Sequence, residues 1–529
     1  MLTRREFIGG ALAAAAFAAC RSEKSIPGEL LGPNHALGHK LREGKFDAPS
    51  STERVPVVIV GGGAAGLSAG WKLLRSGFGE FLVLDLEARA GGNAAWGENA
   101  VSRYPWGAHY LPVPGPRARA VRELLRELKV ITGERGGRPV YDEAALCHAP
   151  EERLFLHGRW QDGLYPRIGA SAADLAERDR FHARMAAFRN KIGRDGRPAF
   201  AIPMEYSSRD PELLALDEIS MAAWLDKNNY RSPGLRWYAE YACRDDFGGT
   251  LEEVSAWAGI HYFAARGEGA DDEMLVWPEG NGFLVRRLAE ALAPRVRTGA
   301  LAFDVRHDAD GVRVDYYDAA SGTVKRLLAK RAVVCAPRFA ARRIVAPLRE
   351  SKASSGFTYA PWAVANLTVS EPPAGVGAAP AWDNVIYGGE GLGYVDATHQ
   401  SFAQNRRDSV WTYYRPLTGD PDARRRAAYK SSLADWREQC LADLERALPG
   451  LRRRVTRLDA WVWGHGMVLP KPGFIWGAER REAARPLGPI HFAHSDLSGY
   501  SIFEEANDRG VRAAEAVLAA LGKPHRSSL

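Results

Sequence analysis

Residues 57–93 read VVIVGGGAAGLSAGWKLLRSGFGEFLVLDLEARAGGN, and this stretch decides the fold. Its first four residues, 57–60, form an apolar, largely β-branched run that is typical of a strand buried on both faces of a parallel sheet. Glycines follow at the spacing G-x-G-x-x-G, at Gly61, Gly63 and Gly66. This spacing allows a tight turn, close approach of the backbone to a pyrophosphate, and close packing of a helix on the strand.

The residues after the glycines continue the same pattern. A helix is expected over residues 64–76, with its positive N-terminal end toward the phosphates and Gly77 at its end. Residues 81–84 predict a second strand, and Asp85 stands at its end, about 20 residues after the glycines. A carboxylate at that place accepts hydrogen bonds from ribose hydroxyl groups. The sequence therefore predicts a dinucleotide-binding α/β unit rather than an isolated glycine-rich turn.

The end of this stretch narrows the choice of cofactor. Asp85-x-x-x-Arg89-x-Gly91-Gly92-Asn93 resembles the acid-x-x-x-Arg-x-Gly-Gly continuation of the superfamily of flavin-dependent amine oxidases, phytoene desaturases and protoporphyrinogen oxidases. NAD dehydrogenases lack this continuation. The family usually has a basic residue after Gly-Gly, where this chain has Asn93. By this resemblance, the adenosine and diphosphate of FAD are held by Gly61, Gly63, Ala65, Gly66, Asp85, Arg89, Gly92 and Asn93.

The resemblance extends to residues 103–112, RYPWGAHYLP. In the family a strand runs past the flavin ring here. The small residues Gly107 and Ala108 would let the isoalloxazine approach, and His109 would contact it. The alternative for His109 is a hydrogen-bonded histidine of the core.

Two later segments resemble further FAD-contacting parts of the family. In the first, which begins near residue 276, Ala302 takes the position whose backbone meets the adenine. In the second, residues 490–496 are expected to form a strand that ends at Asp496, which would bind the ribityl or diphosphate region. Backbone N–H groups near Ile502 and Phe503 would face the O2 side of the flavin, before a helix over residues 508–521.

Four side chains are candidates for a position near the flavin ring: His109, Trp463, His465 and Tyr500. A structural role is an equal alternative for each of them. Many amine oxidases of the family hold a lysine at the flavin N5, on a strand that corresponds to residues 363–369. Residues 353–429 contain no lysine, and a Pro-x-Pro-Gly sequence at residues 470–473 resembles the desaturase and protoporphyrinogen oxidase branch. The electron acceptor and the substrate stay open at this point.

Outside the cofactor motifs, the sequence predicts helices over residues 117–130, 172–191, 283–292 and 424–448, and one that begins near Asp217 or Ser220. Strands are expected over residues 296–305, 312–317, 331–337, 363–369 and 410–414, with a hairpin turn at residues 308–311. The glycine-rich residues 387–394 either cover the active site or turn a hairpin. Six aromatic residues would line a substrate channel or belong to the core: Tyr238, Tyr241, Phe247, Trp257, Tyr262 and Phe263.

The expected fold class is α/β. A Rossmann-like, three-layer FAD-binding domain is assigned to residues 55–112, 274–345 and 456–525. An α+β substrate domain is assigned to the insertions at residues 113–273 and 346–455. The active site is expected between the two parts.

Composition excludes several classes of function. The chain has 529 residues and a net charge of +7, carried by scattered arginine without a long basic block, so nucleic-acid binding is not expected. Its five cysteines are far apart and form no C-x-x-C motif, which gives no support to a disulfide framework or a zinc site. His35 and His39 are four residues apart, but Pro33 and Gly38 argue against a helix there, and no metal site is predicted.

The first twenty residues resemble an export signal. Arg4-Arg5 precedes a short, weakly apolar run, as in twin-arginine signals, which are recognised by the twin-arginine export machinery. Residues 17–20 resemble a lipobox, so that Cys20 would carry a lipid anchor; cleavage by an ordinary signal peptidase is the alternative. The expected location is periplasmic, tethered to the membrane. Residues 21–54 lack a helical or strand period and are interpreted as a tether.

Three functions follow from these features. The first is an FAD-dependent oxidase or dehydrogenase that removes a hydride from an amine or amino compound. The second is an FAD-dependent desaturase or dehydrogenase of an apolar substrate. The third is a flavin-binding partner protein without turnover.

Overall fold

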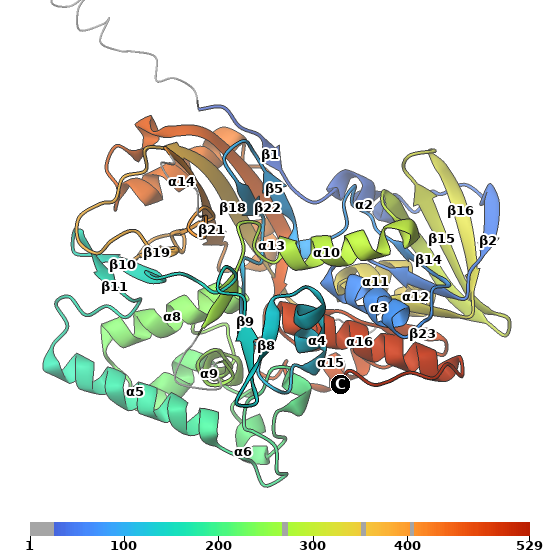
Figure 1. Cartoon of the computed structure of the whole chain (residues 1–529), viewed down its shortest axis with the longest axis horizontal. Coiled ribbons are helices and arrows are strands. Elements are labelled where there is room, and N and C mark those ends of the chain that lie inside the picture. The colour runs from blue at the N-terminus through green and yellow to red at the C-terminus, as the bar shows by residue number, and fades with distance from the viewer. Residues whose placement is uncertain (1–25, 267–272, 351–355, 402–406) are drawn as a thin grey trace, which may run out of the picture.

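The structure is a computed structural model that describes residues 26–266, 273–350, 356–401 and 407–529. The predicted export signal at residues 1–20 lies outside the described residues. The chain builds two large sheets with their helices, side by side in Figure 1.

The first sheet is parallel and contains the predicted glycine-motif strand at its centre. Its strands, in spatial order, are β13 (Val296–Arg297), β4 (Phe81–Leu84), β3 (Val57–Val60), β17 (Arg331–Val334) and β23 (Ile490–Phe492). All four pairings are parallel. Val57 and Ile59 face one hydrophobic core, and Val58 and Val60 face another. The run is apolar throughout because both of its faces are buried.

Helices cover one face of this sheet. They are α3 (Ala64–Arg75), α10 (Gly282–Leu292), α16 (Phe503–Ala520) and α4 (Arg119–Glu127), which share one hydrophobic core with β3 and β4. The helix predicted after the glycines is confirmed, with Gly77 in the left-handed conformation just after it. The helix predicted over residues 508–521 begins five residues earlier, at Phe503.

A four-stranded sheet covers the other face. It contains β14 (Ala300–Asp308), β15 (Gly311–Asp318), β16 (Thr323–Ala329) and β2 (Ser51–Arg54). The hairpin turn predicted at residues 308–311 is confirmed, since Asp308 pairs with Gly311. The single strand expected over residues 296–305 is wrong: Gly299, at φ +64°, separates β13 from β14, and the two strands belong to different sheets.

The second large sheet has eight strands. In spatial order they are β1 (Leu30–Leu31), β22 (Val455–Val468), β18 (Tyr359–Ser370), β21 (Asp408–Pro416), β20 (Tyr394–Asp396), β19 (Asp383–Ile386), β10 (Glu152–Leu156) and β11 (Arg159–Asp162). β19 and β20 pair antiparallel across the glycine-rich residues 387–394, so this segment turns a hairpin.

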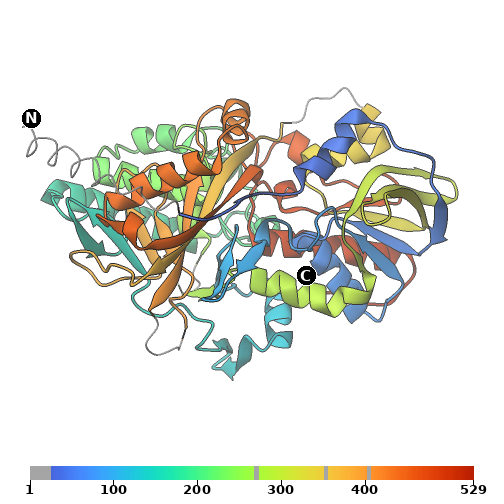
Figure 2. The ribbon, with the colours of Figure 1, turned by 90° about the horizontal axis from the view of Figure 1, so that it is seen from above.

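Helices pack below and above this sheet (Figures 1 and 2). The lower group is α5 (Ala172–Asn190), α6 (Pro211–Leu214), α7 (Met221–Lys227), α8 (Pro233–Phe247) and α9 (Ala256–Ala264). Ser220, not Asp217, caps α7. The single helix predicted over residues 424–448 is instead α13 (Pro421–Ala428) and α14 (Leu433–Glu445), because Ser432 and Asp435 form a capping box that starts a new helix.

The remaining described elements are short. Three two-stranded sheets pair β5 (Trp96–Glu98) with β6 (Arg103–Pro105), β7 (Tyr110–Pro112) with β12 (Met274–Val276), and β8 (Ile131–Arg135) with β9 (Arg138–Tyr141). The short helices are α11 (Arg338–Ile344), α12 (Ala346–Glu350), α15 (Ala478–Ala483) and the 3₁₀ turns η1 (Gly92–Ala94), η2 (Met204–Tyr206), η3 (Ala293–Arg295), η4 (Leu451–Arg453) and η5 (Ser495–Leu497).

Two of the expected boundaries differ from the structure. The sequence assigns residues 456–468 to the FAD-binding part, but they form β22, which pairs along its length with β18 in the eight-stranded sheet. It assigns residues 118–131 to the substrate part, but α4 and Ile131 pack in the core of the parallel sheet. Strand periodicity shows that a segment is a strand without showing which sheet it joins.

The interpretation of residues 21–54 as a tether is wrong for the described residues from 26 onward. They contain β1, a helix α2 (His35–Glu43) and β2, and they pack against both large parts of the molecule. Asn34 caps α2 and Gly44 ends it, so Gly38 does not prevent this helix. His35 and His39 lie on it with ring centroids 5.6 Å apart, and no group of three or more metal-ligating side chains occurs in the described residues.

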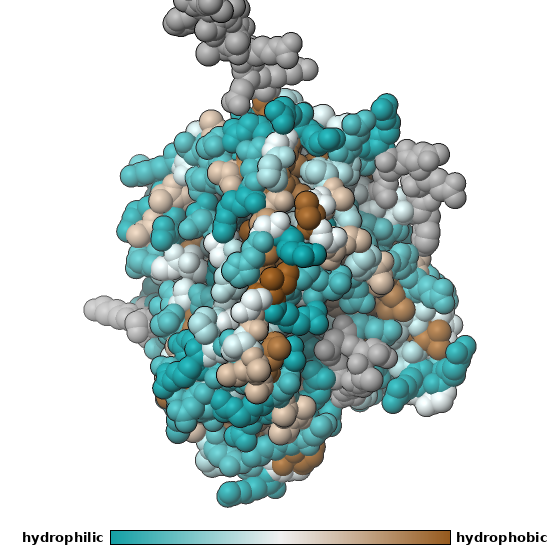
Figure 3. Space-filling view, turned by 90° about the vertical axis from the view of Figure 1, so that its left-hand side faces the viewer, coloured by the Kyte–Doolittle hydropathy of each residue, from teal (hydrophilic) through white to brown (hydrophobic). Residues whose placement is uncertain are grey.

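The surface carries few large apolar side chains. Figure 3 shows a mostly hydrophilic face with scattered hydrophobic residues. Within the described residues, the large exposed apolar side chains are Leu30, Ile192, Val376 and Tyr429. No described helix is both long enough and apolar enough to cross a membrane.

Candidate cofactor and substrate site

The glycine turn after β3 has the close contacts that its spacing predicts. Gly61 has φ +110°, and a Cβ there would lie 2.8 Å from the carbonyl oxygen of Cys335 on β17. A Cβ on Gly66 would lie 1.8 Å from the carbonyl oxygen of Gly61. Neither site accommodates a larger residue, because the opposing atoms belong to the backbone. These contacts bring the start of α3 directly over the end of β3.

The second glycine pair forms the facing wall of this turn. Gly63 bridges to Gly91, and a Cβ on Gly92 would lie 3.0 Å from the Cα of Gly63. Gly92 also has φ +57°, which favours glycine. Two backbone segments without side chains therefore face each other at the N-terminal end of α3, where a diphosphate is stabilised by the helix dipole. Ala65, in the first turn of α3, is buried against α16.

Asp85 ends β4 beside this turn. One of its carboxylate oxygens accepts from the backbone N–H of Gly62 at 2.7 Å, and the other accepts from that of Glu87 at 2.7 Å. Burial raises the pKa of the Asp85 carboxyl to about 6, in spite of these two hydrogen bonds. Asp85 therefore lies against the glycine turn, and its contact with the ribose stays a prediction.

The side chains of Arg89 and Asn93 form hydrogen bonds to backbone carbonyl groups of the protein. The Arg89 guanidinium donates to the carbonyl oxygen of Trp96 and lies 4.2 Å from the centroid of the Trp96 ring. The Asn93 amide donates to the carbonyl oxygen of Gly466 on β22. The predicted contact of these two residues with the diphosphate stays a prediction, and these bonds give them a role in fixing the loop.

The backbone of residues 106–108 is held on both sides. Trp463 on β22 donates to the carbonyl oxygen of Trp106 at 2.6 Å, and Tyr414 on β21 donates to that of Gly107 at 2.9 Å. The N–H of Ala108 donates to the carbonyl oxygen of Asn93 at 3.2 Å, and its own carbonyl oxygen accepts from the N–H of Asn281 at 3.0 Å. The eight-stranded sheet and the glycine-motif loop thus fix the same short segment, which the sequence predicts to run past the flavin.

His109 follows this segment and lies among aromatic rings. Its ring centroid is 4.5 Å from that of Tyr414, 5.1 Å from that of Tyr110 and 5.6 Å from that of Trp382. This environment lowers the pKa of the imidazole to about 4, mainly through burial. His109 is therefore neutral at pH 7.

Carboxylates lie close to this aromatic group. Burial, and then the neighbouring Asp246, raise the pKa of Asp245 on α8 to about 7. Burial also raises the pKa of Asp383 on β19, which accepts a hydrogen bond of 3.1 Å from the Tyr241 hydroxyl. The charges of Asp245 and Asp383 both act on the hydroxyl of Tyr414 and raise its pKa beyond the effect of burial. The side of the site next to His109 is therefore acidic and aromatic.

A cation compensates only part of this acidity. One nitrogen of the Arg266 guanidinium donates to both carboxylate oxygens of Asp246, and another donates to the Tyr110 hydroxyl at 2.8 Å. Among the described residues, no ion pair within 4 Å joins Asp245 or Asp383 to a cationic side chain.

The other predicted catalytic side chains have structural partners. Trp463 is 8% exposed and holds Trp106, as described above. His465 stacks on Phe339 of α11 at 4.0 Å, and burial with the nearby Arg425 lowers its pKa to about 3. Tyr500 is 1% exposed, and its hydroxyl lies between His261 at 3.0 Å and Glu505 at 2.9 Å. Of the four, the structure brings together His109 and Trp463 through residues 106–109, and it places His465 and Tyr500 in other surroundings.

The remaining predicted FAD contacts come from separate elements. Asp496, after β23, is fully buried; it accepts from the Tyr359 hydroxyl at 2.6 Å and from the N–H of Arg338 at 2.7 Å. Ile502 and Phe503 stand at the start of α16, whose first-turn N–H groups have no acceptor within the helix. Ala302 lies on β14 at a bulge.

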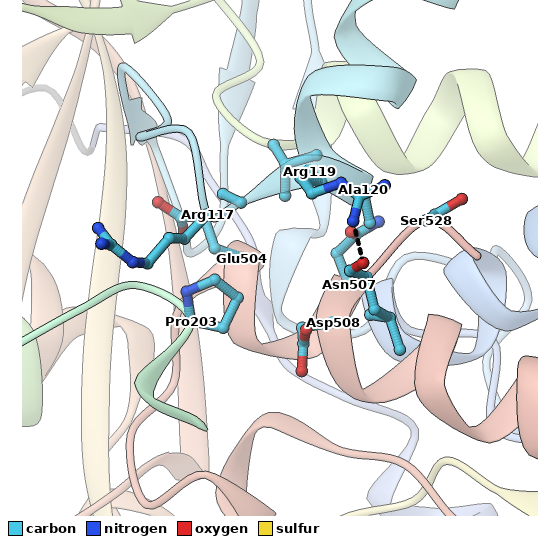
Figure 4. Close-up of a pocket in the computed structure, with 11 residues that line it drawn as sticks. Arg117, Arg119, Ala120, Pro203, Glu504, Asn507, Asp508 and Ser528 are labelled. Atoms are coloured by element: carbon cyan, nitrogen blue, oxygen red, sulfur yellow. Dashed lines mark hydrogen bonds between the residues drawn. The ribbon is translucent and has the colours of Figure 1, made fainter. Parts of the chain in front are cut away.

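These residues fit FAD. The glycine pair forms a cradle that side chains would fill, and Asp85, the residue predicted to contact the ribose, lies beside it. A buried nitrogen of the Arg338 guanidinium has no hydrogen-bond partner among the residues that the structure describes, which suits an anionic group nearby. The pocket in Figure 4, between α4, Pro203 and α16, contains none of the predicted cofactor residues.

Comparison with known proteins identifies the family of this chain. The family model for flavin-containing amine oxidoreductases matches residues 64–518. The chain belongs to the flavin-containing amine oxidoreductase family. It is accordingly an FAD-dependent oxidoreductase, and FAD-dependent amine oxidation is the activity that this membership supports. None of the curated proteins matches the sequence.

Solved structures with the same fold include members with different substrates. Wild-type putrescine oxidase bound to putrescine superposes with a TM-score of 0.63 at 18% identity, over 88% of this chain and 100% of that one. Cyclohexylamine oxidase from Brevibacterium oxydans IH-35A gives 0.63 at 18% identity, over 88% and 99%. The CLA-producing fatty acid isomerase from P. acnes gives 0.60 at 15% identity, over 88% and 98%.

Several site residues were not found from the sequence. Tyr414, Trp382, Asp245 and Asp383 come from elements that are far apart along the chain and meet only in the fold. One signal was available for Asp245: an Asp-Asp pair in the last turn of an otherwise aromatic helix, where acidic side chains oppose the helix dipole.

Proposed function

We propose that this FAD-dependent oxidoreductase oxidises a cationic amine at the site beside His109. The observation that carries the proposal is the pair Asp245 and Asp383, two carboxyl groups near Tyr414 to which no cationic side chain of the described residues forms an ion pair within 4 Å. A buried carboxylate without a cation is costly, and an ammonium group of a substrate supplies that cation. Aromatic faces next to it attract the same charge.

Each residue then has a part in binding and proton movement. Bound FAD supplies the chemistry of accepting a hydride equivalent from the carbon next to the nitrogen. Asp245, whose pKa is about 7, accepts a proton from the substrate ammonium, which must be neutral before it is oxidised. His109 stays neutral and does not repel the cation. Tyr110, Trp382 and Tyr414 exclude water from the reacting carbon.

The proposal is tested by anaerobic reduction of the purified FAD-loaded protein. Monoamines, diamines and amino acids are added, and the loss of the flavin absorbance is followed. At least one amine should bleach the flavin, and Asp245→Asn and Asp383→Asn should each raise the KM for that amine about tenfold or more, as expected for a charge-assisted contact. Bleaching by an apolar substrate and by no amine would instead support a desaturase, and a flavin that no substrate bleaches would support a partner protein.

We further propose that the parallel sheet, its helices and the four-stranded sheet form a Rossmann-like, three-layer FAD-binding domain, and that the eight-stranded sheet with α5–α9 is the substrate domain. The wall of carboxylates on α8 and β19 supports this division, because both elements lie outside the glycine-motif part.

The location is proposed from residues 1–20 alone. We propose export by the twin-arginine machinery and a lipid anchor at Cys20, with the protein in the periplasm. Replacing Arg4 and Arg5 with lysine should leave the protein in the cytoplasm, as followed by cell fractionation. Cys20→Ser should abolish labelling with radioactive palmitate; a label that persists would contradict the anchor.

A further inference from the structure

The N-terminal segment of residues 26–54, here called the clasp, is tied to both halves of the molecule (Figures 1 and 2). At its first end, Leu30 and Leu31 pair with Ala460 and Trp461 of β22, in parallel. The N–H of Glu29 donates to Asp459 at 2.8 Å. Gly28 is so close to β22 that a Cβ would lie 1.7 Å from the carbonyl oxygen of Leu458.

The second end of the clasp joins the four-stranded sheet. Ser51 to Arg54 pair in parallel with β16, from Lys325 to Leu328. The N–H of Ser50 donates to the carbonyl oxygen of Val324 at 2.8 Å, just before this strand. The clasp thus begins on the substrate sheet and ends on the sheet that covers the parallel sheet.

Between its two ends, the clasp crosses the residues that follow β4. The N–H of Asn34 donates to both carboxylate oxygens of Glu87, at 2.9 and 3.1 Å. A Cβ on Gly38 of α2 would lie 3.6 Å from a methyl carbon of Leu86. Leu86 and Glu87 directly follow Asp85, the residue at the ribose position.

The clasp also contacts a residue next to the predicted adenosine position. Phe46 stacks on Phe303 with ring centroids 3.8 Å apart and an angle of 4° between the planes. Phe303 directly follows Ala302, whose backbone is expected to meet the adenine. Two independent contacts therefore place the clasp beside the two residues that would hold the adenosine, Asp85 and Ala302.

We propose that the clasp is a gate over the adenosine half of FAD and sets the rate at which the cofactor enters and leaves. The proposal rests on FAD binding at the glycine motif but not on the identity of the substrate. Because both ends are hydrogen-bonded to strands, FAD passes only when one end has opened. Local opening of a terminal segment costs less than global unfolding, so it controls the exchange rate.

Two substitutions open the gate at different points. Gly28→Val introduces a side chain where Leu458 leaves no room, which detaches the first end. Phe46→Ala removes the stack on Phe303 without a steric clash. Both variants are made in the full chain and loaded with FAD. Release is measured as the rise in FAD fluorescence after dilution, and uptake as its quenching by the apoprotein.

We expect both variants to release FAD at least tenfold faster than the unchanged protein, and to take it up faster as well. Faster exchange in both directions distinguishes a gate from a lost contact, which would change release alone. Leu213→Ala, in the core of the lower helices and far from the clasp, is the control for general destabilisation.

The proposal is overturned if Phe46→Ala exchanges FAD at the unchanged rate, or if Leu213→Ala accelerates exchange as much as the clasp variants do. Phe46→Ala keeps the test valid if Gly28→Val does not fold. A failure of the amine proposal would appear as a flavin that amines do not bleach, with the exchange rates unaffected.

Discussion

The Tyr414 hydroxyl donates a hydrogen bond of 2.9 Å to the carbonyl oxygen of Gly107. These residues are 307 positions apart, and the bond joins the eight-stranded sheet to the segment that is predicted to run past the flavin. Tyr414 also packs against His109 and lies in the field of Asp245 and Asp383. One side chain therefore couples the carboxyl groups of Asp245 and Asp383 to the predicted position of the cofactor.

Tyr414→Phe should lower kcat/KM for the amine about fivefold, since one hydrogen bond contributes about 1 kcal/mol to holding Gly107 in place. Steady-state kinetics on the FAD-saturated enzyme measures the effect. Tyr413→Phe is the matched control: Tyr413 points to the other side of β21 and donates to Asp443 at 3.0 Å. A loss of the same size in both variants would contradict the assigned role.

Asp245→Asn should change how stability depends on pH. The pKa of Asp245 is about 7 in the folded protein, through burial and Asp246, and 3.8 is its ordinary value. The folded protein therefore binds a proton more tightly, and its stability falls as pH rises from about 4 to about 7. The stability of the variant should fall less over this pH range, so that its Tm at pH 8 is higher than that of the unchanged protein. Thermal unfolding of the apoprotein measures both Tm values. Asp179→Asn, at an exposed site, should follow the unchanged curve.

Tyr500→Phe should weaken the fold while sparing catalysis. Removing the hydroxyl leaves buried Glu505 and His261 without that partner, at a cost of about 1–3 kcal/mol in the free energy of unfolding. Denaturant unfolding measures this loss, and kcat/KM should stay within about twofold. A large drop in kcat at unchanged stability would return Tyr500 to the list of catalytic residues.

Gly66→Ala should prevent tight FAD binding. The new methyl group would lie 1.8 Å from the carbonyl oxygen of Gly61, so α3 must move away from β3 and the phosphate cradle opens. The flavin-to-protein absorbance ratio of the purified variant should fall at least tenfold. Gly133→Ala, at a site with open space and without a positive φ, is the comparison for a glycine outside the cradle.

The glycine-motif part of the fold could be predicted because its determinants are local. Residues 57–85 contain the strand, turn, helix, second strand and acid in one continuous stretch, and the structure has each of them at the expected place. The capping box of Ser432 and Asp435 was equally local, and it should have divided the helix predicted over residues 424–448.

The substrate side could not be predicted in the same way. β22 joins the eight-stranded sheet through pairing with β18, about 100 residues earlier in the chain, and nothing within residues 455–468 specifies that partner. The carboxyl groups of Asp245 and Asp383 come from α8 and β19, and the burial that raises their pKa values exists only after folding. Residues 26–54 lack a period because their two strands are short and their order comes from distant partners.

The pairing of β1 with β22 has a consequence for synthesis. The N–H of Glu29 donates to Asp459, 430 residues later, so this contact cannot form until nearly the whole polypeptide has left the ribosome. Contacts of such sequence separation form late and slowly. The first end of the clasp therefore stays undocked through most of translation, and it docks only after β22 has emerged.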